Sequence, residues 1–207
     1  MQKLWDKYVV PPLIGFCCTQ PDVMKERAKT VPRSDGDVLE LGCGGGNNLS
    51  FYDFEKVTSL SGIDPSPELM ERAQSGLQSR GVIADFRQGF GEDMPFSDNQ
   101  FDTVLTTFTM CSVQDTKQVL SEIGRVLRPG GKILFLEHGR APDAGPARWQ
   151  QRIEPVWKRI AGGCHLHRPV GQFFQNEGLT LYDEGGHYAP KTPRWLGWIE
   201  HGEARFN

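Results

Sequence analysis

The sequence predicts an α/β fold built around a mostly parallel sheet, and three observations support this. Segments with strand and helix patterns alternate from residue 37 to residue 137. A glycine-rich loop, Gly42–Gly46, directly follows the first strand segment, and an acidic residue, Asp64, follows the second. Such alternation is typical of parallel strands joined by crossover helices. We therefore expect one sheet with helices on both faces.

Length and charge restrict the class of protein. The 207 residues suit one domain, and the net charge of −3 gives no reason to expect nucleic acid as a partner. Five cysteines at irregular spacing do not suggest a disulfide framework and favour a reducing, cytoplasmic compartment. The apolar stretch 9–18, interrupted by Pro11, Pro12 and Gly15, is too short to span a bilayer. We expect no integral membrane segment, while peripheral lipid contact stays open.

The alternating elements can be placed by their caps and breakers. Asp22 is expected to cap the first helix and Pro32 to stop it, while Ser66 caps the second helix. The turn Pro129–Gly131 closes the third. The expected ranges are helix 22–31, strand 37–41, strand 57–63, helix 67–79, strand 82–87, strand 101–107, helix 116–127 and strand 132–137.

The alternation stops after residue 140. Residues 140–178 look helical and rich in loops, and two final strands are expected over 179–184 and 197–206 as an antiparallel pair at the sheet edge. We divide the single domain, 1–207, into four parts: an N-terminal cap 1–36, a ligand-binding core 37–138, a cover over the substrate side 139–178 and the final strands 179–207.

The glycine loop has the pattern G-x-G-x-G, and Asn47 stands where a dinucleotide fingerprint has its third glycine. No Gly-Lys-Ser/Thr follows, which excludes a Walker loop. Glu40 would repel a pyrophosphate but could hold a cationic amino group. Asp64, twenty positions after Gly44, could accept both hydroxyls of a ribose. The loop therefore favours a nucleoside that carries an amino acid.

Four motifs in order carry a family resemblance. They are Glu40–Gly46, Asp64 after the second strand, Phe101–Leu105 and Leu127–Lys132. Together they resemble the motifs of class I S-adenosylmethionine-dependent methyltransferases. The resemblance implies a Rossmann-like, seven-stranded, mostly parallel sheet with one antiparallel edge strand. It also implies S-adenosylmethionine as cofactor and S-adenosylhomocysteine as product.

The resemblance implies a role for ten residues in binding this cofactor. The methionine part would be wrapped by the glycine loop, the ribose would be held by an acidic residue, and a later loop would flank the adenine, with Phe90 where many relatives have an aspartate. The end of the fourth strand would lie near the sulfonium. The residues are Glu40, Gly42, Cys43, Gly44, Asp64, Pro65, Gly91, Glu92, Thr107 and Phe108.

Methyl transfer needs positioning of the nucleophile and, in some cases, removal of a proton. His138 follows the fifth strand, and histidine is a common general base at neutral pH, which makes His138 a candidate for that role. A histidine that only satisfies backbone groups at a strand end is an equal alternative. The tight run Cys164-His165-x-His167 suggests a metal site, with His138 or Cys111 as a further ligand, but it has no C-x-x-C or H-x-x-x-H partner, so we expect no metal.

A closer resemblance concerns the acceptor. Cys111–Val113, Leu136–His138, Trp149–Trp157 and Gly163–Arg168 resemble a methyltransferase-like branch that includes animal thiol S-methyltransferases. This implies methylation of a small thiol, with acceptor contacts from Cys111, Glu137, Cys164 and Arg168. The rival acceptors are a phospholipid amine, a quinol or a natural product. A protein that binds the cofactor without catalysis is the rival of another class, and a nicotinamide dehydrogenase is less favoured.

Overall fold

The computed structural model describes residues 19–78 and 84–207. The apolar stretch 9–18 lies outside these ranges, as do Ser79 of the second expected helix and the first residues of the strand expected from Val82. Among the described residues, no helix is long and apolar enough to cross a membrane.

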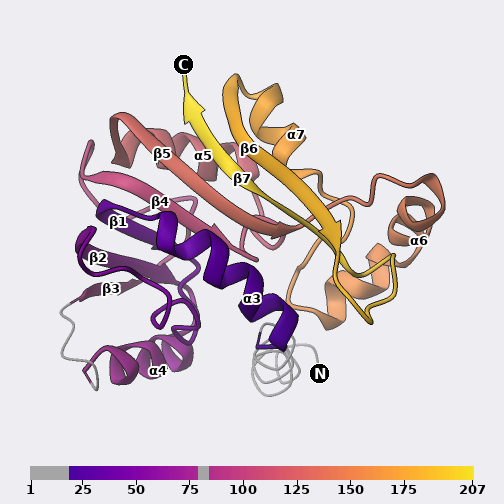
Figure 1. Cartoon of the computed structure of the whole chain (residues 1–207), viewed down its shortest axis with the longest axis horizontal. Coiled ribbons are helices and arrows are strands. Elements are labelled where there is room, and N and C mark those ends of the chain that lie inside the picture. The colour runs from indigo at the N-terminus through magenta and orange to yellow at the C-terminus, as the bar shows by residue number, and fades with distance from the viewer. Residues whose placement is uncertain (1–18, 79–83) are drawn as a thin grey trace.

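One sheet organises this part of the chain, with seven strands in the order β3-β2-β1-β4-β5-β7-β6 (Figure 1). Neighbouring strands from β3 to β5 pair in parallel, whereas β7 runs antiparallel to both β5 and β6. The expected parallel sheet with an antiparallel pair at its edge is confirmed. The strands are β1 Gly36–Leu41, β2 Val57–Asp64, β3 Ala84–Gln88, β4 Phe101–Thr107, β5 Leu127–His138, β6 Leu179–Tyr188 and β7 Trp198–Phe206.

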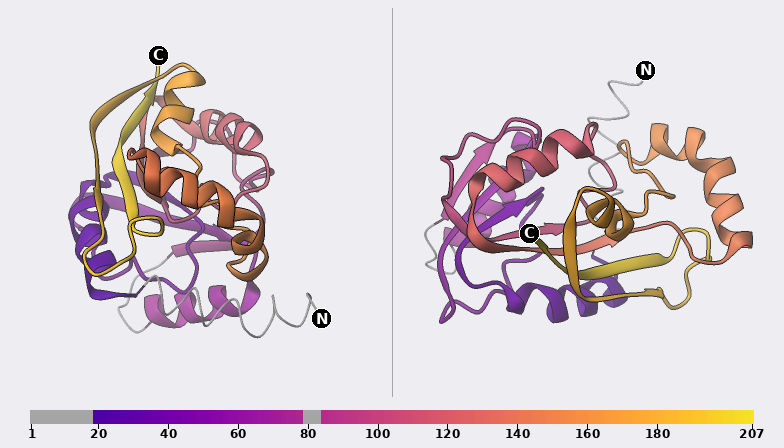
Figure 2. Two further views of the ribbon diagram at one scale, coloured as in Figure 1. Left: turned by 90° about the vertical axis from the view of Figure 1, so that its right-hand side faces the viewer. Right: turned by 90° about the horizontal axis from the view of Figure 1, so that it is seen from above.

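Helices cover both faces of the sheet, with α3 and α5 on opposite sides in Figure 2. Side chains that alternate along β1 belong to different cores. Val38 packs in the cluster that contains residues of α4, whereas Leu39 and Leu41 pack in the cluster that contains residues of α5 and α7. The helices are α3 Pro21–Thr30, η1 Val31–Arg33, α4 Pro67–Gln78, α5 Thr116–Val126, α6 Ala144–Ile160 and α7 Val170–Asn176.

Two sequence-based boundaries need correction. The first helix starts at Pro21, its N-cap is Gln20, and no side chain caps it. Asp22 therefore lies inside the first turn, where it pairs with Lys25 at 2.8 Å. The fifth strand starts at Leu127 rather than at residue 132, because Leu127 already pairs with Phe101 of β4 before a register shift. A proline and two glycines looked like a helix stop, but they lie within the first part of the strand.

The strand order creates the ligand site. From β1 the chain proceeds outward through β2 and β3, and then returns to add β4 and β5 on the other side of β1. The carboxyl ends of β1 and β4 are therefore neighbours whose connections leave in opposite directions. Crevices at such a reversal of strand order are where open α/β sheets bind ligands. Helix α6 lies beyond the end of β5, away from the sheet (Figure 1).

Candidate active site

A cavity of about 570 Å³ opens at the carboxyl ends of β1, β2 and β4. All ten residues that the sequence assigned to the cofactor line it, together with Arg27, Asn47, Ser112 and Gly162 among others. The predicted cofactor residues lie up to about 70 positions apart in the sequence. The structure brings them together because the parallel strands that carry them end at one edge of the sheet. Which part of a ligand each residue contacts stays a prediction.

The glycine loop needs its glycines for conformation and for space. Gly42 has φ +69° and Gly44 has φ +51°, in the left-handed region that favours glycine. A Cβ on Gly42 would lie 2.1 Å from Thr109 Oγ1. Cys43, between them, is buried, and burial raises the pKa of its thiol, so it packs as a neutral side chain. The loop backbone is therefore held close to both the β4–α5 connection and the cavity.

Asp64 closes one side of the loop. Its Oδ2 accepts a hydrogen bond from Gly44 N at 2.9 Å, and its Oδ1 accepts one from Ser66 N at 2.9 Å. Burial raises the pKa of the carboxyl, while these two backbone bonds oppose the rise. The carboxylate is consequently fixed at the cavity wall, where the ribose contact was expected.

Glu40 lies at the bottom of the cavity and is almost fully buried. Asn48 Nδ2 donates to its Oε1 at 2.8 Å, and the Tyr52 hydroxyl donates to its Oε2 at 2.7 Å. Desolvation raises the pKa of Glu40 to about 7, and it outweighs the lowering by Tyr52, Arg27 and Asn48. A cation that entered the cavity would favour the ionised form of this group.

Arg27 is a cavity residue that the sequence did not reveal. It extends from α3, is 4% exposed, and its Nη1 donates to Asn48 Oδ1 and to Thr107 Oγ1, each at 2.7 Å. Its guanidinium also lies 5.2 Å from the centre of the Phe108 ring. Arg27 and Asn48 thereby connect the cap helix to Glu40. No sequence motif contains either residue. Arg27 lies in a helix with a polar sequence, where a basic residue is ordinarily exposed at the surface.

The side of the cavity assigned to adenine differs in detail from the expectation. Glu92 Oε1 accepts hydrogen bonds from Gln114 N at 3.0 Å and from Asp115 N at 3.2 Å, which fixes the start of α5. The adenine contact of Glu92 therefore stays a prediction that competes with this structural role. Phe90 is 61% exposed and also lines the cavity. An open aromatic face of this kind suits stacking on a base.

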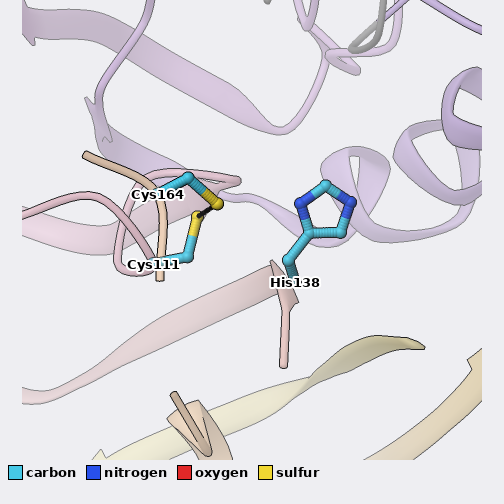
Figure 3. A group of neighbouring side chains, drawn as sticks. All are labelled: Cys111, His138 and Cys164. Carbon is cyan, nitrogen blue, oxygen red and sulfur yellow. Dashed lines mark hydrogen bonds between the residues drawn. The ribbon is translucent and has the colours of Figure 1, made fainter. Parts of the chain in front are cut away.

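Phe108 separates the cavity from a group of three potential ligands. Its backbone has φ +56°, an uncommon value for a bulky residue, and its ring centre lies 4.8 Å from that of His138. His138, Cys111 and Cys164 converge beside it, with the two sulfurs 3.7 Å apart (Figure 3). None of the three is among the described residues that line the cavity, although Phe108, Ser112 and Gly162 are.

Glu137 has a different position from the one expected for an acceptor contact. It is fully buried, and it accepts hydrogen bonds from the Thr106 hydroxyl at 2.7 Å and from three backbone N–H groups at 3.0–3.3 Å. Those donors are Thr109, Met110 and Cys111. Burial raises the pKa of Glu137, and these bonds oppose the rise. Its carboxylate therefore fixes the backbone conformation of the loop after β4.

The cover is joined to the same loop. The Arg168 guanidinium donates to the carbonyls of Met110 and Val113, and His165 N donates to the Cys111 carbonyl at 2.8 Å. The rings of His165 and His167 both contact the carboxylate of Glu154 on α6. The run Cys164–Arg168 thus divides its functions: its histidines hold α6, its arginine holds the loop, and Cys164 faces Cys111.

The donor set can be tested against S-adenosylmethionine, which combines a cationic amino acid with an adenosine. Four carboxylates, those of Glu40, Asp64, Glu68 and Glu92, line the cavity beside a loop whose glycines allow close approach. Among the described lining residues the one buried cation, Arg27, donates hydrogen bonds to Asn48 and Thr107. This distribution fits a cationic nucleoside better than a pyrophosphate. A parallel sheet of this order with such a site defines the class I S-adenosylmethionine-dependent methyltransferases.

Comparisons with known proteins agree with this class. The family described as "Methyltransferase domain" matches residues 39–135. Thiol S-methyltransferase TMT1B of Mus musculus is 39% identical over 174 residues, which are 81% of this chain and 70% of that protein. The chain belongs to this methyltransferase family.

Further relatives differ in what they act on. TMT1B of Rattus norvegicus is 41% identical over 136 residues, or 63% of this chain and 54% of that protein, so the chain spans little more than half of its length. A phosphatidylethanolamine N-methyltransferase of Cereibacter sphaeroides is 34% identical over 124 residues, 59% of this chain and 60% of that protein. A solved methyltransferase from Methanosarcina mazei has a TM-score of 0.68 at 19% identity, covers 86% of this chain and 95% of its own, and shows the fold.

Proposed function

We propose that the protein transfers the methyl group of S-adenosylmethionine to the sulfur of a small thiol. The observation that carries methyl transfer is that two carboxylates, Glu40 and Asp64, line the same cavity as the glycine loop. The likeness to thiol S-methyltransferases supports a thiol acceptor, and in the mouse relative the aligned length reaches 174 residues, well beyond the cofactor motifs. A thiol becomes a strong nucleophile once it has lost its proton.

The residues of the chain would bind, orient and shield. Glu40 would pair with the amino group of the cofactor, and Asp64 would accept from its ribose hydroxyls. When bound, the cofactor supplies an activated methyl group and its own leaving group. Phe108 and Ser112 line the side of the cavity next to the cover. His138, whose ring packs against Phe108 of the cavity wall, would accept the thiol proton, so that the sulfur attacks as thiolate.

A lipid amine is the second acceptor that a specific observation favours. Helix α6 exposes Trp149, Val156 and Ile160, and Arg152 lies over the Trp149 ring at 5.9 Å. Exposed apolar side chains beside basic residues suit contact with an anionic lipid surface. The relative that acts on phosphatidylethanolamine is consistent with this alternative. A cytoplasmic location stays a prediction under either acceptor.

A product screen separates these functions. The purified full chain is incubated with methyl-labelled S-adenosylmethionine and either a panel of small thiols or vesicles that contain phosphatidylethanolamine. We expect labelled methyl thioethers with the thiols and no labelled lipid. Labelled lipid without any labelled thioether would show that the acceptor is the lipid amine and not a thiol. Binding of S-adenosylhomocysteine without any labelled product would identify a non-catalytic binding protein.

A further inference from the structure

Three side chains that ligate metals in many proteins meet beside the cavity. Cys111 follows β4, His138 ends β5, and Cys164 follows α6, so three separate segments contribute one residue each. Their ligand atoms all lie within 4.8 Å of one another. Figure 3 shows the two sulfurs directed at each other and one ring nitrogen of His138 turned toward them. This convergence is independent of the residues assigned to the cofactor.

The separation of the sulfurs is suited to a shared ion. Two thiolates bound to one tetrahedral Zn²⁺ at about 2.3 Å lie about 3.8 Å apart. The Cys111 and Cys164 sulfurs are 3.7 Å apart. A histidine nitrogen within 4.8 Å of both sulfurs completes three of four tetrahedral positions. Two thiolates and an imidazole are soft to borderline ligands, which favours zinc over magnesium or calcium.

We propose that Cys111, His138 and Cys164 bind one Zn²⁺, whose fourth position takes the sulfur of the methyl acceptor. The second half of this proposal rests on the proposed thiol function, and the first half does not. Three protein ligands with one open position is the arrangement of catalytic rather than structural zinc sites.

The position of the cluster supports a fourth ligand from the cavity. Ser112, which lines the cavity, directly follows Cys111, and its hydroxyl lies 3.5 Å from the Cys111 sulfur. Phe108, another lining residue, packs against the His138 ring. Gly162 lines the cavity two residues before Cys164. Each ligand is thus next to a residue of the cavity wall.

Other possible ligands are less suited. His165 and His167 contact Glu154, which holds them on the α6 side of the cover. A second group, Glu26, His187 and His201, also brings its ligand atoms within 4.8 Å of one another. Glu26 of that group pairs with Lys29 at 2.8 Å, and the group contains no thiol. It serves as an internal control for the location of the ion.

The site would change how the acceptor loses its proton. On binding, the acceptor thiol releases its proton to solvent and its sulfur forms a bond to zinc. The sulfur electron pair then forms a bond to the methyl carbon while the bond from that carbon to the cofactor sulfur breaks. A methyl thioether and S-adenosylhomocysteine result, and no oxidant or reductant is consumed. His138 then acts as a metal ligand, instead of as the general base expected from the sequence.

The first experiment measures zinc in the full chain, under reducing conditions and without any substrate. The protein is equilibrated with Zn²⁺, desalted against a weak chelator and analysed for metal. We expect about one zinc per chain, which Cys111→Ser, Cys164→Ser and His138→Asn each abolish. The control variants Cys43→Ser, His187→Asn and the double variant Cys17→Ser with Cys18→Ser should keep it. Equal zinc in the wild type and the three ligand variants, or none in the wild type, would overturn the site.

A second readout uses the spectrum of the wild-type protein, so that it does not depend on how well the variants fold. Co²⁺ replaces Zn²⁺, and thiolate-to-cobalt absorption should appear in the wild type and be lost in each single cysteine variant. Addition of a thiol acceptor should change the cobalt spectrum, and addition of ethanolamine should not. Mass spectrometry that finds a Cys111–Cys164 disulfide under the same reducing conditions, with no bound metal, would contradict the proposal.

The two proposals fail separately. Bound zinc without thioether formation would leave the metal site standing and end the thiol function. Thioether formation that persists unchanged after complete removal of zinc would leave the thiol function standing and would overturn the second half of the proposal, in which zinc binds the acceptor sulfur.

Discussion

Arg27 Nη1 donates a hydrogen bond of 2.7 Å to Thr107 Oγ1, which joins the cap helix to the end of β4 across 80 residues of sequence. The same nitrogen donates to Asn48, which in turn donates to Glu40. The floor of the cavity is therefore assembled from α3, the segment that follows the glycine loop and two strands. Five predictions concern this floor and the loops beside it.

Replacement of Arg27 by alanine should weaken both the fold and ligand binding. It would leave Glu40 and the Asn48 amide oxygen without a buried cationic partner, which costs about 3 kcal/mol of the free energy of unfolding. We expect at least a tenfold weaker affinity for S-adenosylhomocysteine. Urea unfolding and calorimetry measure the two effects. Lys25→Ala, on the exposed side of the same helix, is the matched control. Unchanged affinity in Arg27→Ala would contradict the role of the network.

Ligand affinity should depend on the ionisation of Glu40. The pKa of Glu40 is about 7 in the ligand-free protein. If the ionised form alone pairs with the amino group, the affinity for S-adenosylhomocysteine should rise roughly eightfold from about pH 6 to about pH 7.5. Glu40→Gln should bind more weakly and show no such rise. Calorimetry across this range tests the idea, with the exposed Glu55→Gln as control. A wild-type affinity that falls as the pH rises would contradict the pairing of ionised Glu40 with the amino group.

The same shift affects stability. The folded pKa of Glu40 lies above the ordinary glutamate value of 4.5, so the folded protein holds more protons between these values. The stabilisation that results from this pKa difference is fully present below about pH 4.5 and is lost as pH rises through about 7. Glu40→Gln should remove this part of the pH dependence of the free energy of unfolding. A slope identical in wild type and variant would show that Glu40 titrates near its ordinary value.

Asp64 should contribute through ribose hydroxyls. Asp64→Asn keeps the size of the side chain, removes its charge and replaces one of the two oxygens that accept from Gly44 N and Ser66 N. A hydrogen bond to a charged group contributes about 1.5–3 kcal/mol. We expect a loss of roughly tenfold or more in affinity for S-adenosylhomocysteine. The loss should be smaller for the analogue that lacks the 2′-hydroxyl, because the lost contact is already absent. Asp85→Asn, in an exposed ion pair with Arg87, is the control. Equal losses with both ligands would refute the ribose contact.

Glu137 should act as a positioning residue for the loop after β4. In Glu137→Gln an amide group replaces one oxygen that accepts backbone N–H bonds, so we expect a loss of about 2 kcal/mol in the free energy of unfolding. Hydrogen exchange at residues 109–111 should increase more than elsewhere. The exposed Glu184→Gln should change neither. If Glu137 contacted the acceptor directly, KM would rise while exchange at the loop stayed unchanged.

The local sequence specified much of the fold and the cofactor side of the site. Strand and helix patterns, together with the cap at Ser66 and the proline at the first helical position, correctly predicted the start of α4. They failed at Asp22, because a proline at the first helical position moved the cap to Gln20. They also failed at the start of β5, where pairing with β4 overrides a turn-like sequence. Pairing between strands distant in the sequence decided that boundary.

The sequence by itself determined the glycine loop and the two carboxylates, because each belongs to one contiguous strand and turn whose ends a parallel sheet must bring to one edge. Only the tertiary structure decided their surroundings. Arg27 and Asn48 reach Glu40 through packing of α3, and burial rather than residue type raises the pKa of that carboxyl. Cys111 and Cys164 are 53 residues apart in the chain, and their meeting beside His138 follows from how the cover folds back. Spacing rules describe ligands within one segment, and so these rules gave no signal for a cluster that three segments build.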